Sequence, residues 1–475
     1  MQHWILTATV VLGVANVVVL SVVLLLQKRS PAATLAWLFA LAFLPGLGVI
    51  IFLFVGPRRL ERSRLKRLRA RQAVARPAYE IEERVMKEAM SRELSRQIVQ
   101  IGHRTNQSPV SVAEEVTLLE DGEETFGAIL AAIAAAKNHV HVEYYIYEPD
   151  RTGTALRDAL IERAKAGVEV RLLVDAVGSA NLDRRFLAPL REAGGEAFFF
   201  NKVRRLRKSR FVNFRNHRKI VVCDGRVGFT GGLNVHDEDN TAYRVDGWRD
   251  THLRMKGPCV TWLQLVFLED WHYTRGSVPQ GQRYLPLDGP GAAGELVQIL
   301  DSGPDSDVET IKTAYFAAIN AAKRKVWITT AYFVPDESIL LALKAAAHRG
   351  VDVRILVPSV SDSAIVMAAG RSYYDELLHT GVRIYEYQRR MLHAKTMVVD
   401  DWFAAVGTAN MDNRSFRLNF EVTALVYGAR LSEELSAMFK RDRKNAVEIS
   451  KSHGTKLPVS EKLLQGVARL LSPLL

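Results

Sequence analysis

The sequence has 475 residues but only two cysteines, Cys223 and Cys259, so a scaffold held together by disulfides is excluded. Hydrophobic residues make up 48% and charged residues 24% of the chain, which excludes a wholly disordered protein. The opening Met1-Gln2-His3 lacks the positive charge of a cleaved signal peptide. Because no carboxylate cluster or Cys/His grouping has metal-ligand spacing, we expect neither a metal nor another cofactor.

Two apolar runs without an ionisable side chain stand at the N-terminus, at residues 4–26 and 32–55. Each exceeds the roughly 20 residues that a transmembrane helix needs. The basic cluster that follows at 58–71 holds eight Lys and Arg against one acidic residue. The positive-inside bias then predicts a multi-pass protein of the inner (cytoplasmic) membrane, with its catalytic domain in the cytoplasm. Pro45 and Gly46 leave open a second run that re-enters instead of spanning.

A second basic segment, 201–220, holds nine Lys and Arg and no acidic residue, although the whole chain has a net charge of only +12. Such a segment could bind nucleic acid through phosphate contacts and stacking, or it could lie on an anionic bilayer. Since the N-terminus predicts a membrane anchor, we expect anionic membrane lipids as partners and no nucleic acid.

The C-terminal segment carries apolar residues at helical spacing: Leu463, Val467, Leu470, Leu471 and Leu474. They would form one face of a helix. Such a face fits either a membrane surface or docking on the protein core, and the sequence leaves both open.

The remaining chain contains one pattern twice. Residues 136–150 match 322–336, and residues 166–174 match 349–357. In each copy helical segments alternate with apolar strands, which predicts an α/β fold of two homologous halves with mixed sheets flanked by helices. The predicted domains are a membrane anchor with two transmembrane helices (1–57), a basic helical linker (58–110), a first half (111–289) and a second half (290–475).

Late in each half, a histidine is followed at fixed distances by lysine, aspartate, glycine and asparagine. The two sets are His217, Lys219, Asp224, Gly231 and Asn234, and His393, Lys395, Asp400, Gly407 and Asn410. Residues two apart on a strand share a face, so each histidine and lysine project together. A two-residue turn at Asp224-Gly225 would pair residue 217 with 232, and residue 393 with 408 in the second half. A duplicated core hairpin would not need these polar residues, so the repetition indicates catalysis.

One imidazole and one ammonium in each hairpin make half of a phosphoryl-transfer site. One neutral histidine would attack phosphorus, and the other, protonated, would give its proton to the leaving alkoxide. The two lysines, with Asn234 and Asn410, would bind the non-bridging oxygens. Each histidine also needs an acceptor for its second ring nitrogen, for which Asp250 and Glu421 are candidates.

These motifs resemble the phospholipase D superfamily, and with the two apolar runs and the segment Asn213–Lys219 the chain is similar to bacterial cardiolipin synthases from residue 4 to the C-terminus. The resemblance implies transfer of a phosphatidyl group from one phosphatidylglycerol to another, giving cardiolipin and glycerol. It implies a phosphohistidine on His217, His393 as acid and then base, no metal, and Glu421 as the partner of His393. Thr408 departs from the commoner serine. Asp224 and Asp400 belong to the motif, and we expect them to brace the hairpins.

Three points remain open in the sequence. A hydrolytic phospholipase D and a membrane-tethered phosphodiesterase or nuclease use the same chemistry, and a homo-oligomer is compatible with the chain. The symmetry of the motifs does not assign the two histidines. Arg215 and Arg218 flank His217 and would lower its pKa, which suits the nucleophile, whereas His393 has no such neighbours.

Overall fold

The computed structural model describes residues 17–18, 20–22, 24–26, 31–44, 47–48, 93–201, 213–277, 284–286, 294–452 and 457–475. The chain divides into two compact units: Met1–Arg59 with Val203–Asn213, and Leu60–Lys202 with Phe214–Leu475. In the first unit, α2 (Pro31–Phe43) packs through Leu41 on Leu24. No helix of the described residues has the length and apolar character to cross a bilayer. Residues 4–16, 19 and 23 of the first predicted span and 45–46 and 49–55 of the second lie outside the described residues. So do the whole first basic segment, 58–71, and residues 202–212 of the second.

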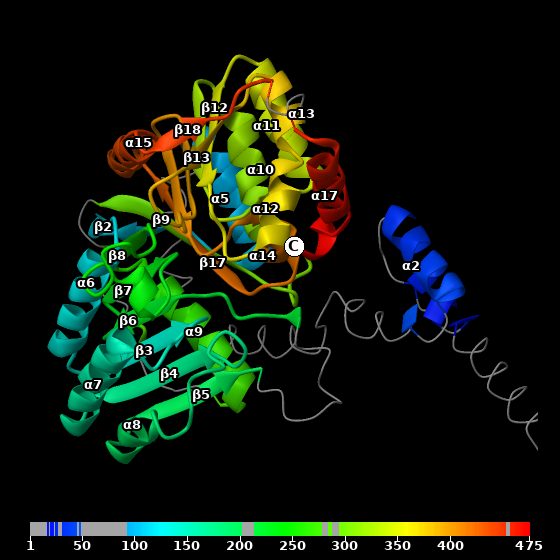
Figure 1. The fold of residues 1–475 in the computed structure, drawn as a ribbon. Helices are drawn as coiled ribbons and strands as arrows, with labels where there is room; N and C mark the ends of the chain where they lie inside the picture. The colour runs from blue at the N-terminus through cyan, green and yellow to red at the C-terminus, as the bar shows by residue number, and fades with distance from the viewer. Residues whose placement is uncertain are drawn as a thin grey trace, which may run out of the picture. The chain divides into compact units, whose positions relative to one another are not determined.

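The second unit holds two sheets with the same strand order (Figure 1). The first sheet runs β2-β8-β7-β6-β3-β4-β5, in which β3, β4 and β5 are parallel and the other pairs antiparallel. Its strands are β2 (Glu115–Leu119), β3 (His139–Tyr144), β4 (Glu169–Asp175), β5 (Glu196–Phe200), β6 (Ile220–Cys223), β7 (Val227–Gly231) and β8 (His252–Lys256).

The second sheet repeats this order as β9-β17-β15-β14-β10-β12-β13 and adds β1 and β18 at its edges. The strands are β1 (Ser111–Ala113), β9 (Glu295–Ser302), β10 (Lys325–Thr329), β12 (Asp352–Pro358), β13 (Arg383–Tyr387), β14 (Thr396–Val399), β15 (Phe403–Gly407), β17 (Glu421–Tyr427) and β18 (Ala446–Glu448); β11 (Phe333–Val334) pairs separately with β16 (Met411–Asp412). The predicted pair of α/β halves with mixed sheets is therefore confirmed. Residues 111–113, assigned by sequence to the first half, pair with β9 and belong to the second sheet.

Helices cover both faces of each sheet. One face of the first sheet is covered by α6 (Gly122–Ala135), α7 (Arg151–Lys165) and α8 (Ala188–Glu192). One face of the second sheet is covered by α10 (Thr310–Ala321), α11 (Glu337–His348), α12 (Ala364–Arg371) and α13 (Tyr374–His379). The opposite faces carry α9 (Val260–Arg275) and α15 (Ala429–Arg443). Because α9 also contacts β9 and α15 contacts β2, both helices join the two halves.

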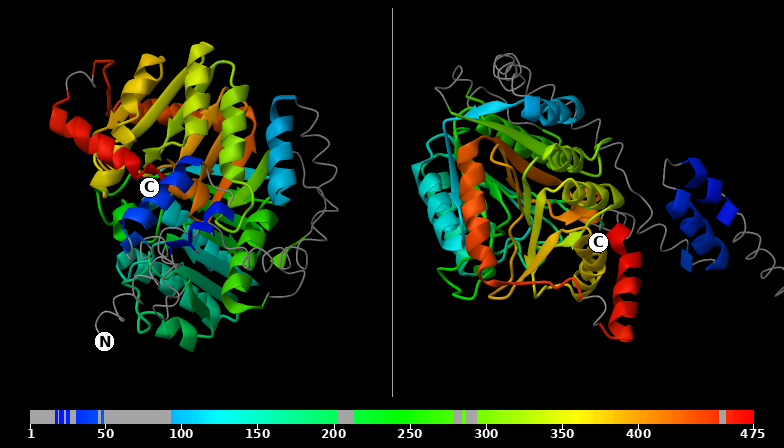
Figure 2. Two further views of the ribbon diagram at one scale, coloured as in Figure 1. Left: turned by 90° about the vertical axis from the view of Figure 1, so that its right-hand side faces the viewer. Right: turned by 90° about the horizontal axis from the view of Figure 1, so that it is seen from above.

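The repeated sequence explains the repeated helices. Asp150 and Asp336 occupy matching positions, and each caps a helix by accepting a hydrogen bond from a backbone N–H three residues on. The remaining elements are α5 (Glu93–Asn106), which packs on α10, and α14 (Asn413–Arg417), α17 (Val459–Leu470), η2 (Asp237–Asp239) and η4 (Ser472–Leu474). Figure 2 shows α17, in red, at the edge of the second half.

Candidate active site

Each motif histidine lies just before the first strand of a hairpin, since β6 begins at Ile220 and β14 at Thr396. Cys223 pairs with Val227, so the loop between β6 and β7 has three residues. The second hairpin has the same loop, because Val399 pairs with Phe403. The predicted two-residue turn is therefore wrong, and the pairing is displaced by one residue.

The two motif aspartates fix these loops. Asp224 accepts hydrogen bonds from the backbone N–H groups of residues 137, 138 and 139, at 2.9, 2.7 and 3.0 Å. Asp400 accepts them from residues 323, 324 and 325, at 3.0, 2.8 and 2.9 Å. Both have positive φ, 54° and 50°. Their carboxylates thus hold the turn end of each hairpin to the start of β3 or β10, away from the histidine end. These contacts fit the bracing role expected for the two aspartates.

The carboxylate that binds each histidine comes from the opposite half. His217 Nδ1 lies 3.0 Å from Glu421 Oε2, and His393 Nδ1 lies 2.7 Å from Asp250 Oδ2. The implied pairing of Glu421 with His393 is therefore wrong. The cause is a crossing of the backbones: His217 N donates to the carbonyl of Phe420 at 2.9 Å, and His393 N to that of Arg249 at 2.7 Å. Each bridge brings the next residue, a carboxylate, under the imidazole.

The two pairs differ in the residue that follows the motif glycine. In the second half the hydroxyl of Thr408 donates a hydrogen bond to Glu421. Thr408 thus supplies the hydroxyl expected from the commoner serine. In the first half the equivalent residue is Gly232, where a Cβ would collide with the carboxylate of Asp250. Gly232 therefore leaves the space that Asp250 occupies.

Both lysines fold back onto their own histidine. Lys219 Nζ donates to the carbonyl of His217 at 2.8 Å, and Lys395 Nζ donates to that of His393. Lys395 Nζ also lies 3.9 Å from Asp250 Oδ2. Burial, and then repulsion by Lys395, lowers the pKa of Lys219 to about 7. Two buried ammonium groups that repel each other are suited to hold an anion between them.

The flanking arginines do not distinguish the histidines, contrary to expectation. Arg218 turns away into a buried network, 2.5 Å from Asp270 and 2.9 Å from Asp301. Burial lowers the pKa of His217 to about 4, with Lys219 adding to the shift against the opposing effect of Glu421. Burial and Lys395 also hold the pKa of His393 well below its usual value. Both imidazoles are therefore poised to be neutral near pH 7 in the absence of a ligand.

The partner carboxylates differ instead. Burial raises the pKa of Asp250 to about 7, and the nearby carboxylate of Asp239 contributes. Burial alone would raise the pKa of Glu421. The attraction of His217 and hydrogen bonds from His217 and Thr408 outweigh burial, so the pKa of Glu421 is lowered. The Asp250–His393 pair can therefore hold a proton near neutral pH, whereas the Glu421–His217 pair gives its proton up at lower pH.

Asp239 was missed by sequence reasoning. It is fully buried, accepts a hydrogen bond from the backbone N–H of Asn234 at 2.6 Å and lies 2.9 Å from His236 Nε2. The matching position in the second half is Ser415, whose hydroxyl accepts the same bond from Asn410 at 3.1 Å. A comparison of the two copies five residues after each asparagine would have revealed this unmatched charge.

The two motif asparagines are both buried. Asn234 Oδ1 accepts a long hydrogen bond, 3.4 Å, from the backbone of Ile146. Asn410 Oδ1 has no hydrogen-bond partner within the described part of the chain. The free carbonyl oxygen of Asn410 can accept a hydrogen bond from a hydroxyl group, whereas a phosphate oxygen would be bound by the Nδ2 donor of the same amide.

One group of side chains here has the composition of a metal site. Asp239, Asp250 and His393 offer ligand atoms that all lie within 4.8 Å of one another. However, Asp250 is hydrogen-bonded to His393, and Asp239 Oδ2 lies 2.9 Å from His236 Nε2 and accepts from the backbone N–H of Asn234, while Asp239 Oδ1 has no partner among the described residues. These contacts fit a proton-holding cluster better than an open coordination sphere.

The fold and this site define a two-half protein of the phospholipase D type. The family described as "Cardiolipin synthase, PLD-like domain" matches residues 129–245 and 315–443, and "Phospholipase_D-nuclease N-terminal" matches residues 14–57. A cardiolipin synthase of Geobacillus sp. (strain WCH70) is 44% identical over 468 residues, covering 97% of this chain and 92% of that protein. One of Alkalihalophilus pseudofirmus is 40% identical over 483 residues, covering 100% and 95%.

The chain therefore belongs to the cardiolipin synthase family, and it is an enzyme of the phospholipase D type. Among solved structures, a phosphatidylserine synthase of Haemophilus influenzae has a TM-score of 0.61 at 15% identity, covering 80% of this chain and 100% of that one. At this identity, the likeness supports the fold alone.

Proposed function

We propose that the protein transfers a phosphatidyl group from one phosphatidylglycerol to a second, producing cardiolipin and glycerol. The observation that carries the proposal is the crossed arrangement of two histidine–carboxylate pairs around two buried lysines, in a chain of the cardiolipin synthase family. One site then holds a nucleophile, an acid and the positive charge needed for a phosphodiester.

In the first step, His217 Nε2 attacks phosphorus, and the bond from phosphorus to the glycerol oxygen breaks. The proton held by the His393–Asp250 pair passes to that oxygen, and glycerol leaves. In the second step, His393 takes the proton of a hydroxyl on the second phosphatidylglycerol, whose oxygen attacks phosphorus and releases His217. Lys219, Lys395, Asn234 and Asn410 would bind the non-bridging oxygens, and one diester is consumed and another is formed overall, through a phosphorus–nitrogen bond to His217.

The assignment of His217 as nucleophile rests on the different partner carboxylates. The pKa of Glu421 is lowered and that of His217 falls to about 4, so this imidazole is free to attack. The pKa of Asp250, raised to about 7 mainly by burial, keeps a proton beside His393. The charge asymmetry thus favours the same assignment that the family resemblance implies, but through carboxylates rather than arginines.

Covalent trapping tests the assignment. The His393→Ala variant, given a phosphatidyl ester whose leaving group needs no proton, should accumulate a phosphatidyl group on His217, detected by mass spectrometry. The His217→Ala variant should form no adduct. An adduct on His393 would reverse the two roles.

Product analysis separates this function from its alternatives. Purified protein with labelled phosphatidylglycerol should yield cardiolipin and free glycerol. Phosphatidic acid as the main product would instead identify a hydrolytic phospholipase D. Cleavage of single-stranded DNA without lipid turnover would identify a nuclease, the alternative that the basic segment 201–220 had suggested.

We also propose that the site needs no metal, since the two lysines can supply the positive charge. Activity should then survive a strong chelator. Complete loss that a divalent ion restores would show that Asp239, Asp250 and His393 hold a cation after all.

The apolar runs 4–26 and 32–55 support a further proposal, an anchor of two membrane spans with the catalytic part on the cytoplasmic side. A tag after Arg71 should be cytoplasmic, and one between residues 27 and 31 should lie on the opposite face. A cytoplasmic location for both would show that the second run re-enters the membrane.

A further inference from the structure

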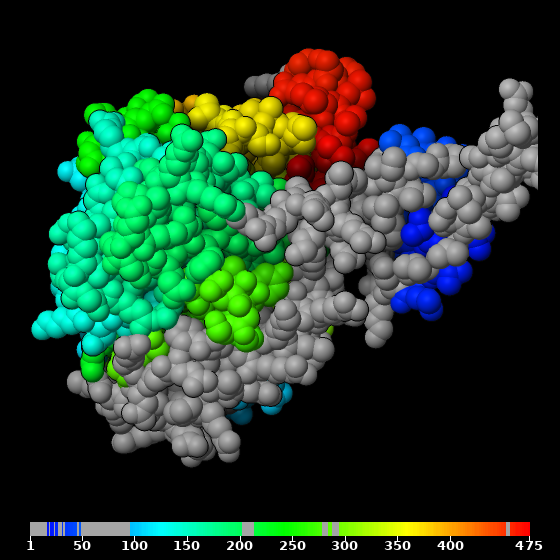
Figure 3. Space-filling model, turned by 90° about the horizontal axis from the view of Figure 1, so that it is seen from below, coloured from blue at the N-terminus to red at the C-terminus, as the bar shows by residue number. Residues whose placement is uncertain are grey.

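The C-terminal helix α17 presents an apolar face to solvent. Its exposed fractions are 73% at Val459, 65% at Leu463, 61% at Val467 and 79% at Leu470. Spacings of four, four and three residues place these side chains on one face. Figure 3 shows the C-terminal segment, in red, standing out from the surface. The sequence left open whether this face docks on the protein core or on a membrane surface. Its exposure excludes docking on the core.

Exposed apolar side chains also stand near the start of the neighbouring helix α12. The two helices pack against each other. On the α12 side, Val360 is 55% and Ile365 51% exposed. We call the six residues Val360, Ile365, Val459, Leu463, Val467 and Leu470 the α12–α17 face.

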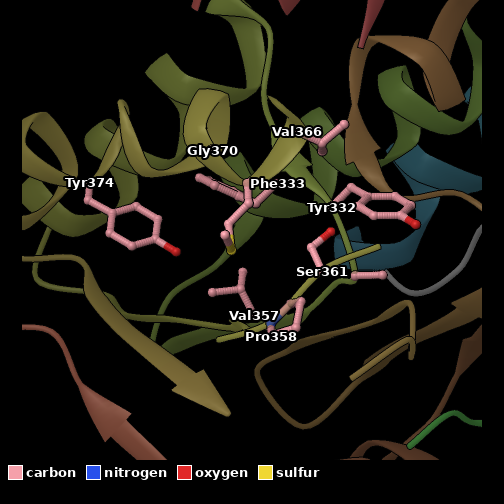
Figure 4. Close-up of a pocket in the computed structure, with 10 residues that line it drawn as sticks. Tyr332, Phe333, Val357, Pro358, Ser361, Val366, Gly370 and Tyr374 are labelled. Atoms are coloured by element: carbon pink, nitrogen blue, oxygen red, sulfur yellow. The ribbon is translucent and has the colours of Figure 1, made fainter. Parts of the chain in front are cut away.

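A small cavity of about 20 Å³, room for about one water molecule, lies against α12 (Figure 4). Its lining is largely apolar and includes Tyr332, Phe333, Val357, Pro358, Val366 and Met367. Tyr332 also faces the active site, since its ring centroid lies 6.4 Å from that of His393. Helix α12 thus connects three features: the exposed face, an apolar cavity and the reacting histidine.

We propose that the α12–α17 face docks on the membrane leaflet that holds the substrate. The inference rests on the proposed function, because a phosphatidyl group can reach His393 only if its hydrocarbon part stays in contact with apolar surroundings. The six residues of the face are uncharged, and Lys462 on the same helix is exposed, which suits an anionic lipid surface. The other two charged residues of α17, Glu461 and Arg469, are half-buried, and Arg469 is paired with Glu376 at 2.9 Å.

Fluorescence quenching tests the docking on the full chain in vesicles of phosphatidylglycerol and phosphatidylcholine. The native Cys223 and Cys259 are buried, so an environment-sensitive label will react selectively with Leu463→Cys or Val467→Cys. The matched control is Asp158→Cys, an exposed position on α7 in the first half. We expect spin-labelled lipid to quench the two α17 labels several-fold more than the control.

Equal quenching at all three positions would overturn the proposal. So would α17 labels that are shielded from water but not quenched by lipid. If such labels transfer energy between molecules, the face joins a second copy of the chain, and otherwise another part of the chain covers it.

Activity gives an independent readout. The double variant Leu463→Glu/Val467→Glu should lose about tenfold activity on bilayer phosphatidylglycerol but none on a short-chain, monomeric phosphatidylglycerol. The control Val447→Glu replaces an equally apolar side chain, 56% exposed, on the edge strand β18. Unchanged activity on bilayers, or equal loss on both substrates, would contradict docking. A wild-type protein inactive on every phosphatidylglycerol would refute the proposed function, while quenching would still decide the docking.

Discussion

At the scale of single residues, the duplicated motif is symmetric in its histidines and lysines but not in what surrounds them. Gly232 stands where the second half has Thr408, and Asp239 stands where it has Ser415. Both differences act on the Asp250–His393 pair: one makes room for the carboxylate, and the other places a second negative charge nearby. Two histidines with the same motif can thus take different roles.

The charge of Asp239 predicts a change in pH dependence. It helps to raise the pKa of Asp250 to about 7, so Asp239→Asn should let the Asp250–His393 pair lose its proton at lower pH. Because this proton serves the leaving group, the alkaline limb of the kcat/KM profile should move down by about one pH unit. The control is the exposed neighbour in Glu238→Gln. An alkaline limb that stays in place in Asp239→Asn would show that Asp239 is only structural.

The close approach at Gly232 predicts a second effect. A methyl group in Gly232→Ala would collide with Asp250 and displace the carboxylate that orients His393. A displacement of about 1 Å at such a group can lower kcat by about 10²-fold. Gly127→Ala on α6 is the control, because a Cβ there meets no atom within 4 Å. Steady-state kinetics and thermal unfolding of both variants check this, and full activity in Gly232→Ala would contradict the geometry.

At the scale of elements, the hairpin that carries the motif recurs in both halves together with its sheet and flanking helices. Local sequence predicted both hairpins and the matching helices, because periodicity and turn residues act over a few positions. It failed on the loop length, since Asp224-Gly225 is typical of a two-residue turn. The three-residue loop depends on backbone N–H groups more than 80 positions away, which bind the Asp224 carboxylate. Contacts at that range are invisible to a local pattern.

These hairpin contacts predict a stability effect that is separate from catalysis. Asp400→Ala removes the acceptor of three backbone N–H groups and should lower the free energy of unfolding by about 2–3 kcal/mol. Asp400→Asn should lose less, because asparagine keeps one acceptor and tolerates the positive φ. Thermal unfolding measures the order of the two variants. The bracing role would be refuted if Asp400→Ala unfolded like wild type but lost its activity.

At the scale of the whole molecule, the two halves share one site. Sequence symmetry predicted that the halves come together, but it could not predict the crossing, because the partner of His217 lies 204 positions away in Glu421. Each half alone contains a histidine without its carboxylate. The interface therefore positions the catalytic groups as well as holding the halves together.

Buried ion pairs fix this interface. Arg218, directly after His217, binds Asp270 in its own half and Asp301 in the other, and it donates to the carbonyl of Glu421 at 3.1 Å. Arg249, directly before Asp250, binds Asp442 of the second half at 3.0 Å. Each crossed histidine–carboxylate pair thus has a charged contact between halves beside it.

The Arg218–Asp301 contact predicts linked losses of stability and activity. Asp301→Ala leaves the buried guanidinium with one carboxylate fewer, which should cost about 3–5 kcal/mol of unfolding free energy. Because the same guanidinium holds the backbone of Glu421, kcat should fall below wild type at temperatures where the variant remains folded. Lys165→Gln, which removes an exposed pair with Glu162 on α7, should cost less than about 1 kcal/mol and leave kcat unchanged. If Asp301→Ala were destabilised but kept its full kcat, the interface would join the halves without positioning His217.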